Sequence, residues 1–560
     1  MTNTPRQLGI AAIAFCLSLS LSIALIARKN LYEDELFSFK LIPHPVSEIW
    51  ASANSDDVHP PGMYVLSHVF YELTHSERWT VAGPLLLLYA GLALYAAAIL
   101  PALASDTLAV VFFSALTFFN PQLLMWGISL RWYSYWTALA LVALALHVPK
   151  PLPAANHATK SNEARPWAYL LSGIILGVMY YLNYLSIFFG AALAAAALIA
   201  SRDRRRVAIG FTAMAITAGL MALPQVGTML HVHLPGSGSS QQSSAIVAAA
   251  RMFHGVFISE AILPWRPIAM VFAMVVAVPL FVRELRFATR LCIGRARSES
   301  GALPVFVLAF FVVLGLAGCV TGLGVKPRSF IVLSPVLGTV LAFGFLRLSR
   351  KAARYLLLAV TCVWAAWGAN DLLRREGTAK GGMNDHPEEV SEFVRAEAGP
   401  GCGAVFTHDP GLAYVLTRDL APLRRFAVIS TYPDWVHGLP EGNWQPTCQP
   451  DKVFVVTSTV GSLNLNKVLE PALTHAVRLI DHPAVRQFGP DPDVRYKRLM
   501  AGPGVSLPSF RFTVQYGPVI RGAGIASAAA DFREVWRAQD AINRARGGIP
   551  GAAGSPVGPR

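Results

Sequence analysis

Charged residues are scarce in this sequence. Asp, Glu, Lys and Arg make up 14% of its 560 residues, whereas about 25% is usual for a soluble globular domain. Hydrophobic residues make up 54%, and the mean hydropathy is +0.46. This composition excludes an ordinary soluble protein and predicts a chain embedded in a lipid bilayer.

Several motifs are also missing. The six cysteines show no spacing typical of a zinc site, and the segment GLGVK lacks the spacing of a phosphate-binding loop. No internal repeat is found, although repeats are typical of transporters built from duplicated halves. These absences argue against a zinc module, a P-loop nucleotide site and a duplicated transporter.

Long apolar runs are what the sequence has instead. About 20 apolar residues in a helix cross the roughly 30 Å of bilayer hydrocarbon, and such a segment is helical because it must make its backbone hydrogen bonds internally. About eleven runs approach this length. They lie near residues 8–27, 80–100, 106–126, 132–148, 167–184, 186–201, 206–223, 264–282, 302–322, 329–348 and 352–370.

The connectors between these runs predict the orientation. Basic residues gather in every second loop, around Arg165, Arg205, Arg290 and Arg350, and basic loops stay on the cytoplasmic side. The N-terminus is therefore expected inside, with loops 28–79 and 224–263 and everything after residue 371 outside. The net charge of +14 is interpreted as topology, with no nucleic-acid partner. The first run exceeds a signal-peptide core and lacks a clean cleavage site, so it is expected to remain as an anchor.

The composition changes to that of a soluble domain after the last run. An acidic helix is expected at HPEEVSEFVRAEA, and strands at GAVFTH, RFAVIS, DKVFVVTST and FRFTVQY. Residues 371–545 are predicted to form an extracytoplasmic α/β domain, followed by a Gly/Pro-rich disordered tail at 546–560. Cys402 and Cys448 both lie in this domain, and the sequence leaves open whether they form a disulfide.

The first outward loop carries the acids Glu33, Asp34 and Glu35. Further along, His59 precedes Pro60 and Pro61, which suits a helix start near Pro61. Met63, Leu66, Phe70 and Leu73 would share one face of that helix and lie in the membrane interface. Asp57, His59 and Tyr64 are then candidates for positioning a substrate near headgroup depth.

Basic residues on the outer side run against the general pattern. Arg131 lies in one short outward turn, and Lys326 and Arg328 lie in another. Snorkelling at the interface is the alternative to a phosphate clamp, for which Arg is well suited. Glu33 is interpreted as part of a solvated collar with Arg28 and Lys29. Asp34 is instead predicted to be a general base that deprotonates an acceptor hydroxyl.

The order of these motifs resembles the type-C glycosyltransferases that use polyprenyl-phosphate sugars. Residues 8–370 are similar to the bacterial branch related to protein O-mannosyltransferases and aminoarabinose transferases. The motifs are Asp34-Glu35, DVHPPGMY, Arg131 followed by YSYW, and KPRSF with Arg328. Ser329 stands where the family usually has Tyr.

This resemblance implies an all-α polytopic membrane domain, residues 1–370, in the bacterial inner membrane. It implies that Asp34, in the pair Asp34-Glu35, is the catalytic acid and that Arg328 lies near the donor phosphate. Arg131 and Lys326 are predicted to join Arg328 in the phosphate clamp, and Glu35 is predicted to be catalytic with Asp34. The donor would be a polyprenyl-phosphate-linked sugar, transferred with inversion to a lipid, glycan or protein acceptor. No cofactor is expected, and a divalent-metal requirement stays open; His231 and His233 are interpreted as loop residues. The alternative is a multi-span transporter or flippase of a lipid-linked sugar or small anion.

Overall fold

The computed structural model of the protein describes residues 4–29, 33–56, 60–147, 166–201, 203–228, 254–259, 262, 267–293, 302–321, 330–374, 387–431, 448–458, 466–490, 510–522 and 524–545. Its contacts divide the chain into two compact units. Unit 1 comprises Met1–Arg28 and His44–Gly377, and unit 2 comprises Lys29–Pro43 and Thr378–Arg560.

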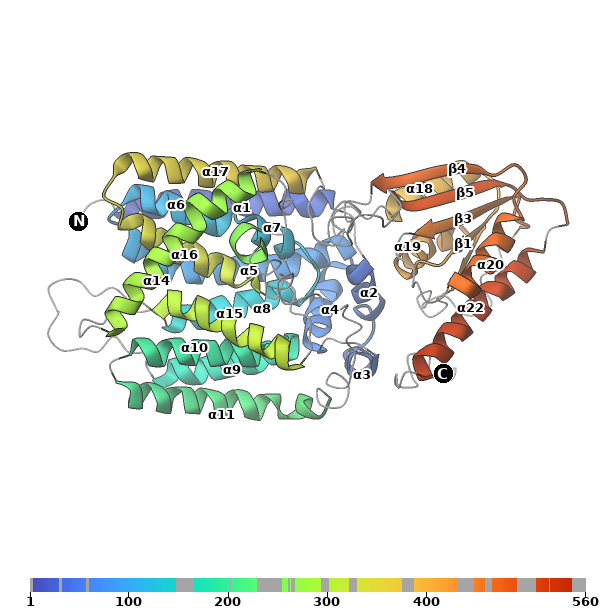
Figure 1. The fold of residues 1–560 in the computed structure, drawn as a ribbon. Helices are drawn as coiled ribbons and strands as arrows, with labels where there is room; N and C mark the ends of the chain where they lie inside the picture. The colour runs from blue at the N-terminus through green and yellow to red at the C-terminus, as the bar shows by residue number, and fades with distance from the viewer. Residues whose placement is uncertain are drawn as a thin grey trace. The chain divides into compact units, whose positions relative to one another are not determined.

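Unit 1 is a bundle of helices (Figure 1). In chain order the described helices are α1 Thr4–Arg28, α3 Val46–Asp56, α4 Gly62–Thr74, α5 Glu77–Leu103, α6 Thr107–Phe118, α7 Pro121–Gly127, α8 Trp132–His147, α9 Pro166–Leu182, α10 Ser186–Ala200, α11 Arg204–Thr228, η3 His254–Ile258, α13 Pro267–Val271, η4 Phe272–Ala277, α14 Val278–Ile293, α15 Ala302–Thr321, α16 Leu333–Leu346 and α17 Lys351–Leu373.

Six stretches among the described residues are long and apolar enough to cross a membrane. They are Pro5–Arg28, Glu77–Leu103, Thr107–Gly127, Arg204–Thr228, Pro267–Arg290 and Lys351–Leu373. Shorter apolar helices occupy Pro166–Leu182, Ser186–Ile199 and Leu333–Leu346. The chain is thus a helical membrane protein, and the number of eleven spans stays a prediction.

Small residues bring the helices of unit 1 close together. A Cβ on Gly91 of α5 would lie 2.7 Å from the carbonyl oxygen of Ala138 in α8. A Cβ on Gly173 of α9 would lie 2.8 Å from the carbonyl oxygen of Met214 in α11. Inside a membrane, helices associate mainly through such close packing, because lipid tails are as apolar as the helix surfaces.

The bundle has two distinct ends. At the end that we call the Arg28 end, α1 and α17 finish and α5 and α8 begin. The opposite end, called the Arg347 end, carries two ion pairs between helices, Arg354 with Asp106 at 2.5 Å and Arg347 with Glu284. The basic residues that predicted the cytoplasmic side gather at this end, in the segments that begin α11, close α14 and join α16 to α17.

Unit 2 contains a five-stranded sheet of order β2-β1-β3-β5-β4. Its strands are β1 Gly403–Thr407, β2 Phe426–Ser430, β3 Lys452–Ser458, β4 Ala484–Pro490 and β5 Phe510–Pro518. Strands β2, β1 and β3 run parallel, while β5 is antiparallel to both of its neighbours. Its helices are α2 Glu33–Leu41, α18 Pro387–Ala398, α19 Pro410–Leu420, the 3₁₀ turn η7 Ala421–Leu423, α20 Asn466–Val477 and α22 Ile525–Ala545.

Side chains of unit 2 alternate between two cores, one on each face of the sheet. Val405 of β1 packs with α18 and α19, whereas Ala404 and Phe406 pack with α20 and α22. Four of the strands and helix α18 lie where the sequence predicts them, and β4 was missed. Cys402 and Cys448 form a disulfide with their Cα atoms 6.2 Å apart.

Helix α2 belongs to unit 2, although the sequence-based division places it in the membrane domain. It packs against α19, and Lys29–Pro43 clusters with the C-terminal residues. The sequence could not indicate this, because α2 and α19 are separated by more than 360 residues along the chain.

Candidate functional site

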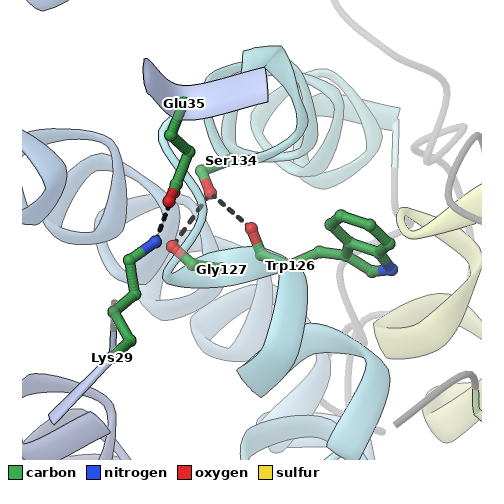
Figure 2. A network of polar contacts seen from close by, with 5 residues as sticks. All are labelled: Lys29, Glu35, Trp126, Gly127 and Ser134. Atoms are coloured by element: carbon green, nitrogen blue, oxygen red, sulfur yellow. Dashed lines mark hydrogen bonds and ion pairs between the residues drawn. The ribbon is translucent and has the colours of Figure 1, made fainter. Parts of the chain in front are cut away.

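Helix α2 carries the predicted catalytic acids. Asp34 lies in its first turn by backbone, and its side chain is outside the described part of the structure. Glu35 is completely buried and forms an ion pair with Lys29, which is 6% exposed (Figure 2). The predicted solvated collar is therefore wrong for Lys29. A buried ammonium needs a partner, and the carboxylate of Glu35 provides it.

Burial lowers the pKa of the Lys29 ammonium, while the negative charges of Glu35 and Glu388 act against that shift. Glu388 lies in the first turn of α18. The negative charge of Glu388 therefore acts on Lys29 from a second helix of unit 2.

The helix that supports α2 is itself fixed to the sheet. The carboxylate of Asp409 caps α19, accepting from the backbone N–H of Leu412 at 2.8 Å. Its other oxygen accepts from the hydroxyl of Ser458 at 2.7 Å. Asp409 follows β1 and Ser458 ends β3, so α19 begins at the carboxyl edge of the parallel strands, where α/β sheets commonly place their functional groups.

A second set of buried polar side chains lies at the Arg28 end of unit 1. Asn120 caps α7, since its side-chain oxygen accepts from the backbone N–H groups of Gln122 and Leu123. The hydroxyl of Ser259 donates to the side-chain oxygen of Gln122 at 3.3 Å. Ser259 has a φ of 107°, a costly conformation for a residue other than Gly, and such strain concentrates at functional sites.

Arg131 lies in the turn between α7 and α8, within the same end of unit 1. Its side chain is buried, at 6% exposure. The turn is fixed by the hydroxyl of Ser134, which donates to the carbonyl oxygens of Gly127 at 3.0 Å and Trp126 at 3.3 Å (Figure 2). A guanidinium this deeply buried is not a snorkelling side chain, which would keep its charge in water.

Tyr64 is buried in α4, next to Met63. The predicted helix start near Pro61 is confirmed, because α4 begins at Gly62. Met63 of the predicted apolar face is buried together with Tyr64 and Ser67, whereas Leu73 is 75% exposed. That this face lies in the membrane interface stays a prediction.

Contacts inside the protein decide which face of α4 is buried. The hydroxyls of Ser67 and Tyr135 lie 3.1 Å apart and tie α4 to α8. A Cβ on Gly62 would lie 2.5 Å from the carbonyl oxygen of Tyr181, so a larger residue could not start the helix in this place. Helix α4 therefore packs as part of the bundle.

Comparison with known proteins adds to this picture. No protein-family model and no curated protein sequence matches the chain. The crystal structure of apo ArnT from Cupriavidus metallidurans matches with a TM-score of 0.52 and 14% identity, covering 91% of this chain and 98% of ArnT. ArnT bound to undecaprenyl phosphate matches with a TM-score of 0.52 and 13% identity, covering 92% and 99%.

The chain has the type-C glycosyltransferase fold. The likeness covers more than nine tenths of the chain, so the match extends into both units. The archaeal oligosaccharyltransferase AglB from Archaeoglobus fulgidus also matches, with a TM-score of 0.40, 11% identity and coverage of 85% of this chain and 73% of AglB. The predicted type-C resemblance is confirmed at the level of the fold.

The remaining predicted site residues of this type-C chain lie outside the described residues. They are Asp57, His59, Lys326 and Arg328, and the same holds for His231 and His233. Within the described ranges, no three His, Cys, Asp or Glu side chains form a group that could hold a metal ion.

Sequence reasoning missed several buried polar residues of the type-C fold. Asp371 is completely buried near the end of α17, and Gln122 and Gln225 are each 1% exposed. A signal for Asp371 existed, because an ionisable residue beside an apolar run is costly and commonly functional. Gln122 and Gln225 carry no such signal, since a neutral amide inside an apolar run does not reveal its partners.

Proposed function

We propose that the chain is an integral-membrane glycosyltransferase that moves a sugar from a polyprenyl-phosphate donor to a hydroxyl of an extracytoplasmic acceptor. The observation that carries this proposal is an acid-bearing helix, α2, directly after the first membrane helix of a type-C fold. One of the matching structures holds undecaprenyl phosphate, which supports a lipid-phosphate donor.

The chemistry follows from the charges of the candidate residues. Asp34 takes the proton of the acceptor hydroxyl, and the acceptor oxygen attacks the anomeric carbon of the sugar. The bond from that carbon to the phosphate oxygen breaks, its electron pair leaves with the polyprenyl phosphate, and the configuration inverts. Arg131, Lys326 and Arg328 stabilise the charge that develops on the departing phosphate, as preorganised donors do in enzymes.

Glu35 serves this mechanism through position. Its ion pair with Lys29 fixes the orientation of α2, so that the neighbouring Asp34 is presented in one direction. Asp57, His59 and Tyr64 are proposed to position the substrates. Preorganisation of this kind matters, because a displacement of about 1 Å at a reacting group can cost about 10²-fold in rate.

The proposed orientation puts the Arg347 end in the cytoplasm of a bacterial inner membrane. The basic segments of α11, α14 and α17 lie at that end, as the positive-inside rule expects. The Arg28 end and unit 2 then face the periplasm, where lipid-linked sugars replace nucleotide sugars as donors.

The test is sugar transfer by the purified protein in lipid nanodiscs. A panel of radiolabelled polyprenyl-phosphate sugars is supplied with a membrane extract as the acceptor, and the release of free polyprenyl phosphate is measured. We expect release with the wild type, none with Asp34→Asn, and near-normal release with the matched control Glu33→Gln. Full activity of Asp34→Asn would remove the proposed base.

The alternative is a transporter or flippase of a lipid-linked sugar. It predicts movement of the labelled lipid between leaflets of proteoliposomes without cleavage of the sugar–phosphate bond. Detection of translocation with no free polyprenyl phosphate would replace the transferase proposal.

A further inference from the structure

Helix α14 turns one face to the bundle as it approaches the Arg347 end of unit 1 (Figure 1). Leu280, Glu284 and Ala288 are buried, and their spacing of four residues puts them on one side of the helix. This side packs against α16, where a Cβ on Gly344 would lie 3.3 Å from the Cγ of Glu284. The residues between its members are therefore directed away from α16.

Three arginines occupy the outer side of α14. Arg283, Arg286 and Arg290 are all exposed, and their spacing of three and four residues makes them neighbours on the helix surface. The guanidinium of Arg283 donates to the backbone oxygen of Arg347 at 2.7 Å. The row of arginines thus begins beside the turn that joins α16 to α17.

The turn adds two further cations, and the whole set is called the basic surface. Its members are Arg283, Arg286, Arg290, Arg350 and Lys351, all of them exposed. Two acids that lie beside these elements are already paired, Glu284 with Arg347 and Asp106 with Arg354. Within the part of the chain that the structure describes, no member of the basic surface forms an ion pair. These cations therefore receive no counter-charge from the described residues.

The basic surface lies at the depth of lipid headgroups. Lys351 is the first residue of the candidate span Lys351–Leu373, and Arg283 lies beside the turn that precedes it. Arg286 and Arg290 follow Arg283 by about 5 and 10 Å along the helix, at 1.5 Å per residue. The polar layer on each side of the bilayer hydrocarbon is about 5–7 Å deep, so the row of arginines crosses it.

Both elements become apolar on the side of the hydrocarbon. Pro279 is exposed and precedes Arg283 by four residues, so it lies on the same face of α14, one turn deeper. Tyr355 is 58% exposed and follows Lys351 by four residues on α17. A ligand that meets cations at one level and apolar side chains at the next level is an amphiphile with an anionic head.

Charge selects among the membrane lipids. Guanidinium groups bind phosphate through paired, charge-assisted hydrogen bonds, and phosphate is the head that phospholipids offer at this depth. A zwitterionic phospholipid brings its own cation, which the basic surface repels. An anionic phospholipid brings none, and it supplies the missing counter-charge.

We propose that the basic surface binds the headgroup of an anionic phospholipid, whose acyl chains lie against Pro279 and Tyr355. This site does not depend on the proposed transferase function, because it follows from charge, exposure and depth alone. In the orientation proposed above it faces the cytoplasmic leaflet, where anionic lipids attract basic segments next to membrane helices.

The experiment measures lipid binding to the full chain in a neutral detergent. Phosphatidylglycerol, or phosphatidylcholine with the same acyl chains, is added at rising concentration, and native mass spectrometry counts the lipids that stay bound. We expect the wild type to bind a phosphatidylglycerol at least tenfold more tightly than phosphatidylcholine. Equal affinity for the two lipids would overturn the proposal.

Two matched variants separate a site from the general attraction between basic residues and anionic lipid. Arg286→Gln/Arg290→Gln removes two exposed charges from α14 and leaves Arg283 in place. It should weaken phosphatidylglycerol binding at least tenfold. Arg204→Gln/Arg205→Gln removes two exposed charges from the start of α11, at the same end of unit 1, and should change the affinity less than twofold. Equal weakening by both variants would overturn the site.

Soluble competitors test the choice of a lipid as the occupant. Glycerol phosphate carries the anionic head without acyl chains, and a polyglutamate peptide represents an acidic protein partner. Neither should displace phosphatidylglycerol from the wild type. Displacement by glycerol phosphate would assign the basic surface to a free anion, and displacement by polyglutamate would assign it to an acidic protein. Either result would overturn the proposal.

Discussion

Replacing Lys29 with Met tests how α2 is held in place. Lys29 and Glu35 have side-chain exposures of 3% and 0%, so Lys29→Met leaves a carboxylate buried with its nearest cation removed. Breaking a buried ion pair from one side costs about 3–5 kcal/mol. At 1.4 kcal/mol per factor of ten, the equilibrium constant for detaching α2 should rise by roughly 10² to 4 × 10³.

Hydrogen exchange of the α2 amides measures this equilibrium directly, because local opening sets their protection. Lys29→Met should lower protection of α2 by the factor above. The double variant Lys29→Met/Glu35→Leu should recover most of it, since replacing a buried pair by apolar side chains is often neutral or stabilising. A double-mutant cycle then gives the coupling between the two residues.

Lys452→Met is the matched control in the same unit. Lys452 pairs with Glu397 at 3.0 Å, but the two side chains are 30% and 36% exposed, and pairs at this exposure contribute about 0–1 kcal/mol. Two results would refute the role of the ion pair in holding α2. One is a change of less than threefold in the hydrogen-exchange protection of α2 in Lys29→Met. The other is equal protection of α2 in the double variant and in Lys29→Met.

Three further predictions concern the donor site, the loop before α13 and the disulfide. Arg131→Ala should raise the KM for the polyprenyl-phosphate donor by tenfold or more, because a hydrogen bond to a charged group contributes about 1.5–3 kcal/mol. The KM for the acceptor should stay unchanged. A donor KM that rises no more than the acceptor KM would exclude the phosphate role of Arg131. Burial lowers the pKa of His254 from 6.5 to about 4, so the folded segment around His254 disfavours the protonated imidazole. The contribution of neutral His254 to folding stability is therefore complete above pH 6.5. It is lost as the pH falls towards 4, by up to about 3 kcal/mol. Hydrogen exchange of residues 254–259 at pH 7.5 and 5 should show this loss, and His254→Gln should abolish the pH dependence. Cys402→Ser should lower the stability of unit 2 by about 4 kcal/mol, from the loop entropy of a 46-residue separation, with no change in the melting of unit 1.

The sequence determined the class of protein and many of its local elements. Hydropathy indicated the bilayer, Pro61 indicated the start of α4, and short runs of β-like composition indicated β1, β2, β3 and β5. These succeeded because helix starts, strand patterns and membrane insertion depend on residues close together in the chain. Strand β4 was missed because its residues Ala484–Gln487 are exposed, so burial imposed no apolar alternation on it.

Tertiary structure decided what the acids and the amides contact. It assigned α2 to the C-terminal unit, buried Lys29 against Glu35, and buried Gln225 with its amide nitrogen donating to Asn54. Glu35 and Lys29 look like an ordinary charged run in the sequence, and Gln225 looks like a polar interruption of a span. Their environments come from α18, α19, α3 and the connection between α9 and α10. Sequence patterns within one segment do not show which other segments it contacts in the fold.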